Sequence, residues 1–173
     1  MKNFVPGMEI RVALKEDLWQ VRELALIIFP FVYENMVVAG QVEYMMDLFY
    51  TPEALVNQFE SGQIFLIVNY QNQPTGFAAY TRLNAEGDFK LNKIYLDYNN
   101  QGKGLGRSLL HDVICRVRAA NGRSLRLNVN RLNKAKNFYQ KMGFKIVKKE
   151  LLDIGGGHYM DDYVMEIKLN PEK

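Results

Sequence analysis

The chain has 173 residues, 48% of them hydrophobic and 24% charged, which suits one domain with a substantial core that needs no disulfide or metal to hold it together. Its 22 lysines and arginines against 19 acidic residues leave a formal charge of +3, too small an excess to indicate a nucleic-acid-binding protein, yet compatible with an anionic ligand at one local site. The single cysteine, Cys115, excludes an intramolecular disulfide and favours a reducing compartment.

The sequence shows no targeting or membrane segment. Residues 1–10 contain no apolar stretch or cleavage pattern typical of a signal peptide, and nowhere do about 18 apolar residues follow one another. Neither histidine lies near other metal-ligating residues at a suitable spacing, so no metal is expected. We therefore expect a cytoplasmic protein without a membrane partner.

The first elements are a strand and a long helix. Alternating residues predict the strand over 8–14. Helical spacing of apolar residues begins at Leu18, and Pro30 should end or kink this helix because proline has no backbone N–H to donate. Residues 30–50 are rich in aromatic side chains and methionine and show no clean periodicity.

A clearer helix is expected over residues 51–62. Thr51 is a typical N-cap, Pro52 suits the first helical position, and Gly62 marks the end. The later elements follow in the order strand 63–70, strand 75–83, strand 89–98, a helix from Leu105 to the stop at 121–122, strand 124–130, a short helix over 133–143, and strands 144–154 and 158–169.

Strands and helices are mixed in this order without strict alternation. This indicates an α+β fold with a mostly antiparallel, mixed sheet of six to seven strands and about four helices. No linker or repeat interrupts the pattern, so residues 1–173 are expected to form a single domain.

Three evenly spaced glycines, at positions 102, 104 and 106, lie where the strand over 89–98 gives way to a helix. The first turn of a helix has free N–H groups and a partial positive charge, so it binds anions where side chains do not block the approach. Glycine removes that obstruction, and Lys103 and Arg107 add fixed charge. The spacing matches neither the dinucleotide pattern GxGxxG nor the GxxxxGK[ST] loop, so a nucleotide hydrolase is not indicated.

The same segment resembles a known family. Its sequence QGKGLG, residues 101–106, is similar to the Q/R-x-x-G-x-G/A motif of the GCN5-related N-acetyltransferases, or GNAT family. The preceding LNKIYLDY resembles the central strand of that family, and NKAKNFYQKMGF, residues 133–144, resembles its later signature. The order of elements along the chain also agrees with the family, which implies the GNAT fold.

The resemblance implies acetyl-coenzyme A as the acetyl donor. Its pyrophosphate would lie over the backbone of the glycine loop, and its pantetheine arm would pair with the strand before it. The residues implied in coenzyme binding are Ile94, Tyr95, Leu96, Gln101, Gly102, Lys103, Gly104, Leu105, Gly106, Arg107, Asn130, Asn133 and Tyr139. A backbone N–H of the strand would polarise the acetyl carbonyl.

Tyr139 matches the family tyrosine beside the coenzyme sulfur, which implies that it protonates the departing thiolate. In many relatives an asparagine lies seven residues earlier; here that position is Leu132, and either Asn130 or Asn133 could reach the coenzyme, with Asn133 preferred. The glutamate that relatives often carry on the central strand as general base is absent around Asn92. A water held by the backbone or by Asn92, or an amine that enters unprotonated, would take its place.

The acceptor is expected at the first helices and the last hairpin. The segments 42–59 and GHYMDDYVMEI resemble, more loosely, those of PaiA-type polyamine N-acetyltransferases, which implies a cationic acceptor. Carboxylates and aromatic faces suit such a ligand. These segments hold the carboxylates Glu34, Glu43, Asp47, Asp161 and Asp162, interleaved with Tyr33, Tyr44, Tyr50 and Tyr159.

Other functions remain open at this point. A protein or peptide N-acetyltransferase uses the same donor chemistry, and a non-catalytic acetyl-CoA-binding regulatory domain is compatible with the missing glutamate. Since many relatives are dimers, the resemblance also suggests a homodimer.

Overall fold

The structure, a computed structural model, describes residues 5–169. Residues 1–4, part of the segment searched for a targeting signal, lie outside this range. The described chain has seven strands, β1 Met8–Val12, β2 Ile64–Tyr70, β3 Gln73–Arg82, β4 Asp88–Leu96, β5 Ser124–Asn130, β6 Lys145–Gly155 and β7 His158–Lys168. Its five α-helices are α1 Leu18–Tyr33, α2 Gln41–Phe49, α3 Pro52–Glu60, α4 Leu105–Ala119 and α5 Ala135–Lys141.

The strands form one mixed sheet in the order β1-β2-β3-β4-β5-β7-β6. All neighbours pair antiparallel except β4 and β5, which run parallel. The seven strands and the mixed topology confirm the expected α+β fold, with five helices where about four were expected.

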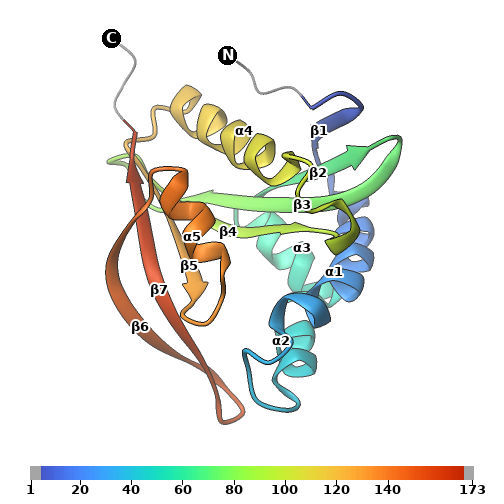
Figure 1. The fold of residues 1–173 in the computed structure, drawn as a ribbon, viewed down its shortest axis with the longest axis vertical. Coiled ribbons are helices and arrows are strands. Elements are labelled where there is room, and N and C mark those ends of the chain that lie inside the picture. The colour runs from blue at the N-terminus through green and yellow to red at the C-terminus, as the bar shows by residue number, and fades with distance from the viewer. Residues whose placement is uncertain (1–4, 170–173) are drawn as a thin grey trace.

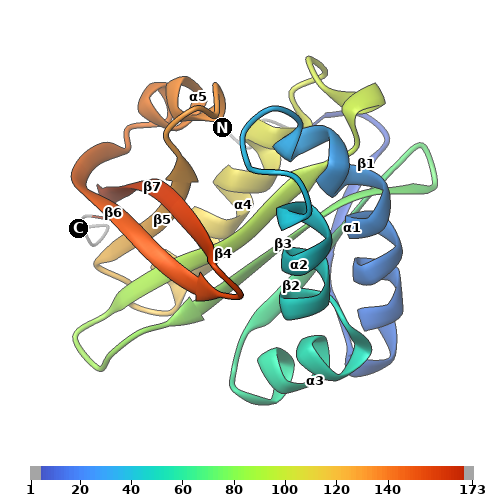
Figure 2. The same cartoon turned by 90° about the horizontal axis from the view of Figure 1, so that it is seen from below.

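Helices cover both faces of the sheet. On one face α4 and α5 pack their apolar residues against β3, β4 and β5, and on the other α1, α2 and α3 pack against β2 and β3 (Figures 1 and 2). Each face therefore has its own buried cluster, and the sheet lies between them. No helix within residues 5–169 is long and apolar enough to cross a bilayer.

Of the two outcomes expected at Pro30, a helix end or a kink, the first is wrong. α1 continues through this residue to Tyr33. Proline removes one backbone donor, but Phe29 and Tyr33 are buried on the inner face of the helix, and this packing holds the last turn in place. Residues 30–50 contain the end of α1, a connecting loop and α2.

The expected caps of α3 are confirmed. The Thr51 side chain accepts a hydrogen bond from the Ala54 N–H at 3.1 Å, and Pro52 is the first helical residue. The structure shortens several other elements: β4 ends at Leu96 because residues 98–100 form a short 3-10 turn, and α5 begins at Ala135 rather than at residue 133.

Candidate functional site

The sheet opens between its two parallel strands. β4 and β5 pair only from Asp88–Leu91 against Ser124–Leu127. On the other edge of β4 the register with β3 shifts, since Tyr80 pairs with Leu91 and Ala79 with Lys93. Asn92 is therefore the extra residue of a β-bulge, and bulges bend a strand.

Beyond the bulge β4 has a strand partner on one side only. Residues 93–96 still pair with β3, whereas β5 has diverged (Figure 1). The second edge of this segment carries backbone N–H and C=O groups that a strand-like ligand could pair with. Of the three residues that the resemblance implies in pantetheine binding, Ile94 and Leu96 turn their backbone N–H and C=O groups to this edge, whereas those of Tyr95 face β3, as does the Asp97 N–H that donates to the Thr75 carbonyl. All three residues are half-buried.

The glycine loop leads directly from this strand into α4. Gly102 and Gly104 have φ angles of +78° and +82°, which glycine adopts without the strain that a side chain would cause, and Gly104 is the N-cap of α4. A Cβ at Gly106 would lie 3.4 Å from Leu96 Cδ1, so the first turn of α4 sits against the end of β4. The free N–H groups of that turn thus follow the open edge of the strand.

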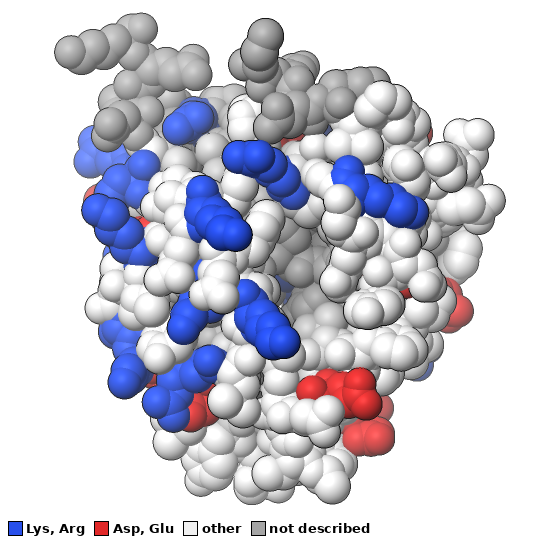
Figure 3. Space-filling model, viewed as in Figure 1, with Lys and Arg blue, Asp and Glu red and all other residues white. Residues whose placement is uncertain are grey.

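The polar side chains of the loop are exposed. Lys103 donates to Asn100 Oδ1 at 2.8 Å and lies over the Tyr70 ring, 5.2 Å from its centroid. Gln101 and Arg107 are also exposed. Figure 3 shows lysines and arginines above and to the left of a central hollow, while acidic residues lie below it. The site therefore has a positive and a negative side.

Tyr139 of α5 is buried at 8% exposure. Its ring packs edge-on against Phe138 and Phe144, with centroids 5.3 and 6.0 Å away. Burial raises the pKa of this phenol above its ordinary value, and the nearby Tyr33 adds to the effect. The hydroxyl consequently keeps its proton throughout the neutral range.

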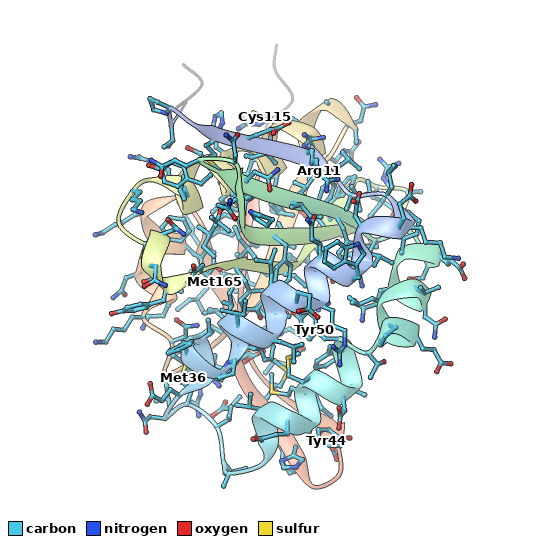
Figure 4. The ribbon with its side chains drawn as sticks, turned by 90° about the vertical axis from the view of Figure 1, so that its right-hand side faces the viewer. Arg11, Met36, Tyr44, Tyr50, Cys115 and Met165 are labelled. Carbon is cyan, nitrogen blue, oxygen red and sulfur yellow. The ribbon has the colours of Figure 1, made fainter. Side chains whose placement is uncertain are left out.

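Tyr33, Tyr50 and Tyr95 form a second group of buried phenols, between α1 and the sheet. The hydroxyls of Tyr33 and Tyr95 share a hydrogen bond at 3.1 Å. The ring of Tyr95 also contacts Phe29 and Phe77, and Figure 4 shows Tyr50 near α1. Burial raises the pKa of all three tyrosines, so the phenols keep their protons and are themselves uncharged.

The two asparagines proposed to reach the coenzyme use their side-chain oxygens locally. Asn130 Oδ1 accepts from the Leu132 N–H at 2.9 Å, and Asn133 Oδ1 accepts from the Ala135 N–H at 2.8 Å. Asn92 donates to the Thr81 hydroxyl at 2.8 Å. The bonds of Asn130 and Asn133 turn the chain at the end of β5 and start α5, the helix that carries Tyr139.

Three of the candidate acceptor carboxylates come together. Glu34, Glu43 and Asp47 line a cavity of about 540 Å³ between α1 and α2, and Tyr33 forms part of its wall. No lysine or arginine lines this cavity. Its negative lining suits a cation.

The remaining candidates lie on the other side of the α1–α2 loop. Asp161 and Tyr159 line a second cavity of about 320 Å³, together with Asn130. Asp161 forms an ion pair with Arg131, whereas Asp162 is buried. Tyr44, at the foot of the molecule in Figure 4, donates to the Ile154 carbonyl at 2.8 Å and so ties α2 to the last hairpin.

The single cysteine and the second histidine lie in different environments. Cys115 is exposed on α4. His158 is half-buried because its ring packs on Tyr44, with the centroids 4.7 Å apart.

Comparison with known proteins decides the family. The family model described as an acetyltransferase (GNAT) domain matches residues 36–158. An uncharacterized N-acetyltransferase of Mycobacterium tuberculosis is 33% identical over 141 residues, 80% of each chain. The chain belongs to the GNAT acetyltransferase family. It is thus an N-acetyltransferase.

Solved structures of GNAT proteins share this fold. The PaiA N-acetyltransferase of Thermoplasma acidophilum, solved in complex with coenzyme A, has a TM-score of 0.78 and 26% identity, covering 94% of this chain and 99% of its own. A GCN5-related N-acetyltransferase of Rhodopseudomonas palustris has a TM-score of 0.79 at 19% identity, covering 96% and 98%, and supports the fold alone.

Sequence reasoning missed Lys93, a buried charge of this GNAT site. The residue directly follows the bulge and is 8% exposed, with Nζ 5.9 Å from the Phe49 ring centroid and 5.1 Å from that of Tyr50. Burial lowers its pKa to about 8, and the charge of Lys90 adds to this. The adjacent polar residues Asn92 and Lys93 interrupt the alternation of β4, and this break is the signal that could have revealed both the bulge and the lysine.

Lys93 makes stability depend on pH. Its pKa falls from 10.5 to about 8 on folding, so its charge destabilises the fold fully below pH 8, and this penalty disappears as the pH rises to the unfolded value. The free energy of unfolding should therefore increase by up to about 3 kcal/mol between these limits. Lys93→Met should lack this increase in urea titrations, while Lys145→Met, which removes an exposed lysine of β6, should keep it. Parallel curves for the wild type and Lys93→Met would contradict the assignment.

Proposed function

We propose that this protein transfers the acetyl group of acetyl-CoA directly to a primary amine of a small molecule, with a polyamine as the favoured acceptor. The observation that carries this proposal is the open edge of β4 ending at the glycine-capped start of α4, with a buried phenol on the neighbouring helix. Such an arrangement suits an extended thioester whose other end is an anion.

In the proposed complex the coenzyme lies along β4 and then over the glycine loop, in the order of the chain. The pantetheine arm runs along residues 94–96 and pairs with the free backbone groups of Ile94 and Leu96, and the pyrophosphate lies over the backbone of residues 101–106. Lys103 and Arg107 supply positive charge, and Asn130 or Asn133 borders the arm. The PaiA relative was solved in complex with coenzyme A, which supports this coenzyme as the ligand of the proposal.

Two groups of the protein assist the proposed acetyl transfer. A backbone N–H of β4 polarises the acetyl carbonyl and stabilises the negative charge that develops on its oxygen. Tyr139 gives its proton to the sulfur as the C–S bond breaks. Its raised pKa keeps that proton available, and its burial keeps water away from the thioester.

The site proposed for the acceptor amine is negatively charged. The cavity lined by Glu34, Glu43 and Asp47 holds three carboxylates among apolar side chains and no basic residue. A polyamine offers separated ammonium groups joined by methylenes, which match this alternation of charge and apolar surface. Tyr33 connects the cavity wall to Tyr95 on β4 through its hydroxyl.

The function is tested by thiol release from acetyl-CoA in the presence of spermidine, spermine, amino acids and peptides with a free N-terminus. The proposal expects turnover that is greatest with the polyamines. The variant Gly104→Glu should lose turnover and the thermal stabilisation by coenzyme A, because a side chain and a negative charge then occupy the anion site. Gly62→Glu has a similar positive φ beyond α3 and should behave as the wild type. Stabilisation by coenzyme A without thiol release would identify a non-catalytic binding domain, and turnover with peptides alone would identify a peptide acetyltransferase.

Tyr139→Phe should lower kcat about 100-fold or more with little change in coenzyme affinity, since the ring remains but the proton is lost. The matched control is Tyr80→Phe, which removes a buried phenol that packs against Phe89. Steady-state thiol release and coenzyme titrations measure both quantities. Unchanged kcat in Tyr139→Phe would remove this residue from the mechanism.

A further inference from the structure

We propose that Asp162, on β7, is the general base that takes a proton from the ammonium group of the acceptor. The proposal rests on the proposed function and names the group that this function leaves open. The resemblance implied a base on the central strand β4, whereas Asp162 lies on β7.

Asp162 faces the side of the sheet on which the acceptor is proposed to bind. It lies two residues after Met160 on β7 and therefore on the same face of the sheet, and Met160 packs against the cluster of α1, α2 and α3. In the sheet it pairs with Asn130 at the end of β5 and with Glu150 of β6. It therefore lies beside the point where β4 and β5 have separated.

Several elements converge on this carboxyl group. Tyr33 of α1 and Lys90 of β4 interact with it electrostatically, as do Glu150 of β6 and Asp161 of its own strand. Tyr33 also acts on Tyr139 and shares a hydrogen bond with Tyr95. One side chain thus connects the proposed base, the proposed acid and the open segment of β4.

Asp162 interacts with the Asn128 side chain but has no ion pair within residues 5–169, unlike the neighbouring carboxylates. Asp162 is 2% exposed, and its Oδ1 atom is buried without a hydrogen bond in the structure of residues 5–169. Asp161 pairs with Arg131, Glu150 with Lys148, and Glu166 with both Arg126 and Lys168. Buried carboxylates are normally paired, because an uncompensated charge is costly. An ammonium group arriving from the acceptor supplies the missing partner.

The environment also tunes the group as a base. Burial raises the pKa of Asp162 to about 6; the neighbouring acids Glu150 and Asp161 raise it, while Asn128 and Lys90 oppose the shift. At neutral pH the group is therefore ionised yet binds a proton more strongly than an ordinary aspartate. General bases work best when their pKa lies near the operating pH.

The proton balance of the step is complete. The ammonium gives one proton to Asp162 Oδ1, and the neutral amine attacks the acetyl carbon. The C–N bond forms, the C–S bond breaks, and the thiolate takes the proton of Tyr139. The second proton leaves the nitrogen as the amide forms and restores Tyr139 by way of solvent. Asp162 then releases its proton to solvent, so each turnover releases one proton.

Asp162→Asn tests the proposal because it preserves shape and removes the base. At pH 7 kcat/KM should fall at least about 100-fold, and the acidic limb of the pH profile should disappear. Coenzyme affinity should not change, and thermal stability should be equal or higher, because a buried unpaired charge has been removed. Glu166→Gln is the matched control: it alters a buried but paired carboxylate of the same strand, so stability should fall while kcat/KM stays within about threefold.

Two small acceptors separate a base from a packing residue. Ethylamine is an ammonium ion at pH 7, whereas 2,2,2-trifluoroethylamine of similar size is neutral. Asp162→Asn should be strongly impaired with the first amine and less than tenfold with the second. Equal impairment with both, or a base defect that appears in Lys93→Met instead, would overturn the proposal.

A measurement without turnover distinguishes this proposal from the function on which it rests. In protein labelled at aspartate carboxyl carbons, the NMR resonance missing from Asp162→Asn should titrate near pH 6 and shift when spermidine is added to the coenzyme A complex. Absence of wild-type turnover with every amine would reject the proposed function. A resonance that titrates near pH 4 and ignores spermidine would reject Asp162 as the base.

Discussion

The separation of β4 from β5 is the constraint on which the rest of the structure depends. Parallel pairing stops after Leu91 and Leu127, and the bulge at Asn92 bends β4 just there. A strand in the middle of a sheet normally has both edges filled, so this opening leaves backbone donors and acceptors for a ligand to use. The two layers of helices stabilise the sheet despite this opening, because each face of the sheet keeps its own core.

Charge is divided across this opening. The glycine-capped start of α4 and its basic residues form a positive side, and the carboxylates between α1 and α2 form a negative one. Between them lie buried tyrosines whose raised pKa values keep them neutral. In the proposed reaction an anionic coenzyme and a cationic amine therefore approach from opposite sides, and the buried tyrosine rings between them exclude water from the thioester.

Local features of the sequence predicted well what local physics determines. The three glycines, the N-cap Thr51 and the alternation of the strands fix elements through neighbours in the chain, and the structure has them where expected. Tertiary contacts decide the rest: burial of Phe29 carries α1 through Pro30, and aromatic rings from another element cover Lys93. The unpaired oxygen of Asp162 likewise depends on strands and a helix far apart in sequence. The sequence could therefore name Asp162 as a candidate carboxylate, but it could not predict its burial or its raised pKa.

Hydrogen–deuterium exchange with and without coenzyme A tests the central claim most directly. If the open edge of β4 and the start of α4 hold the coenzyme, exchange should slow at the amides of Ile94, Leu96 and residues 102–106, while β6 at the far edge of the sheet stays unchanged. Binding that leaves exchange at these amides unaltered, or that protects another surface in their place, would contradict the account.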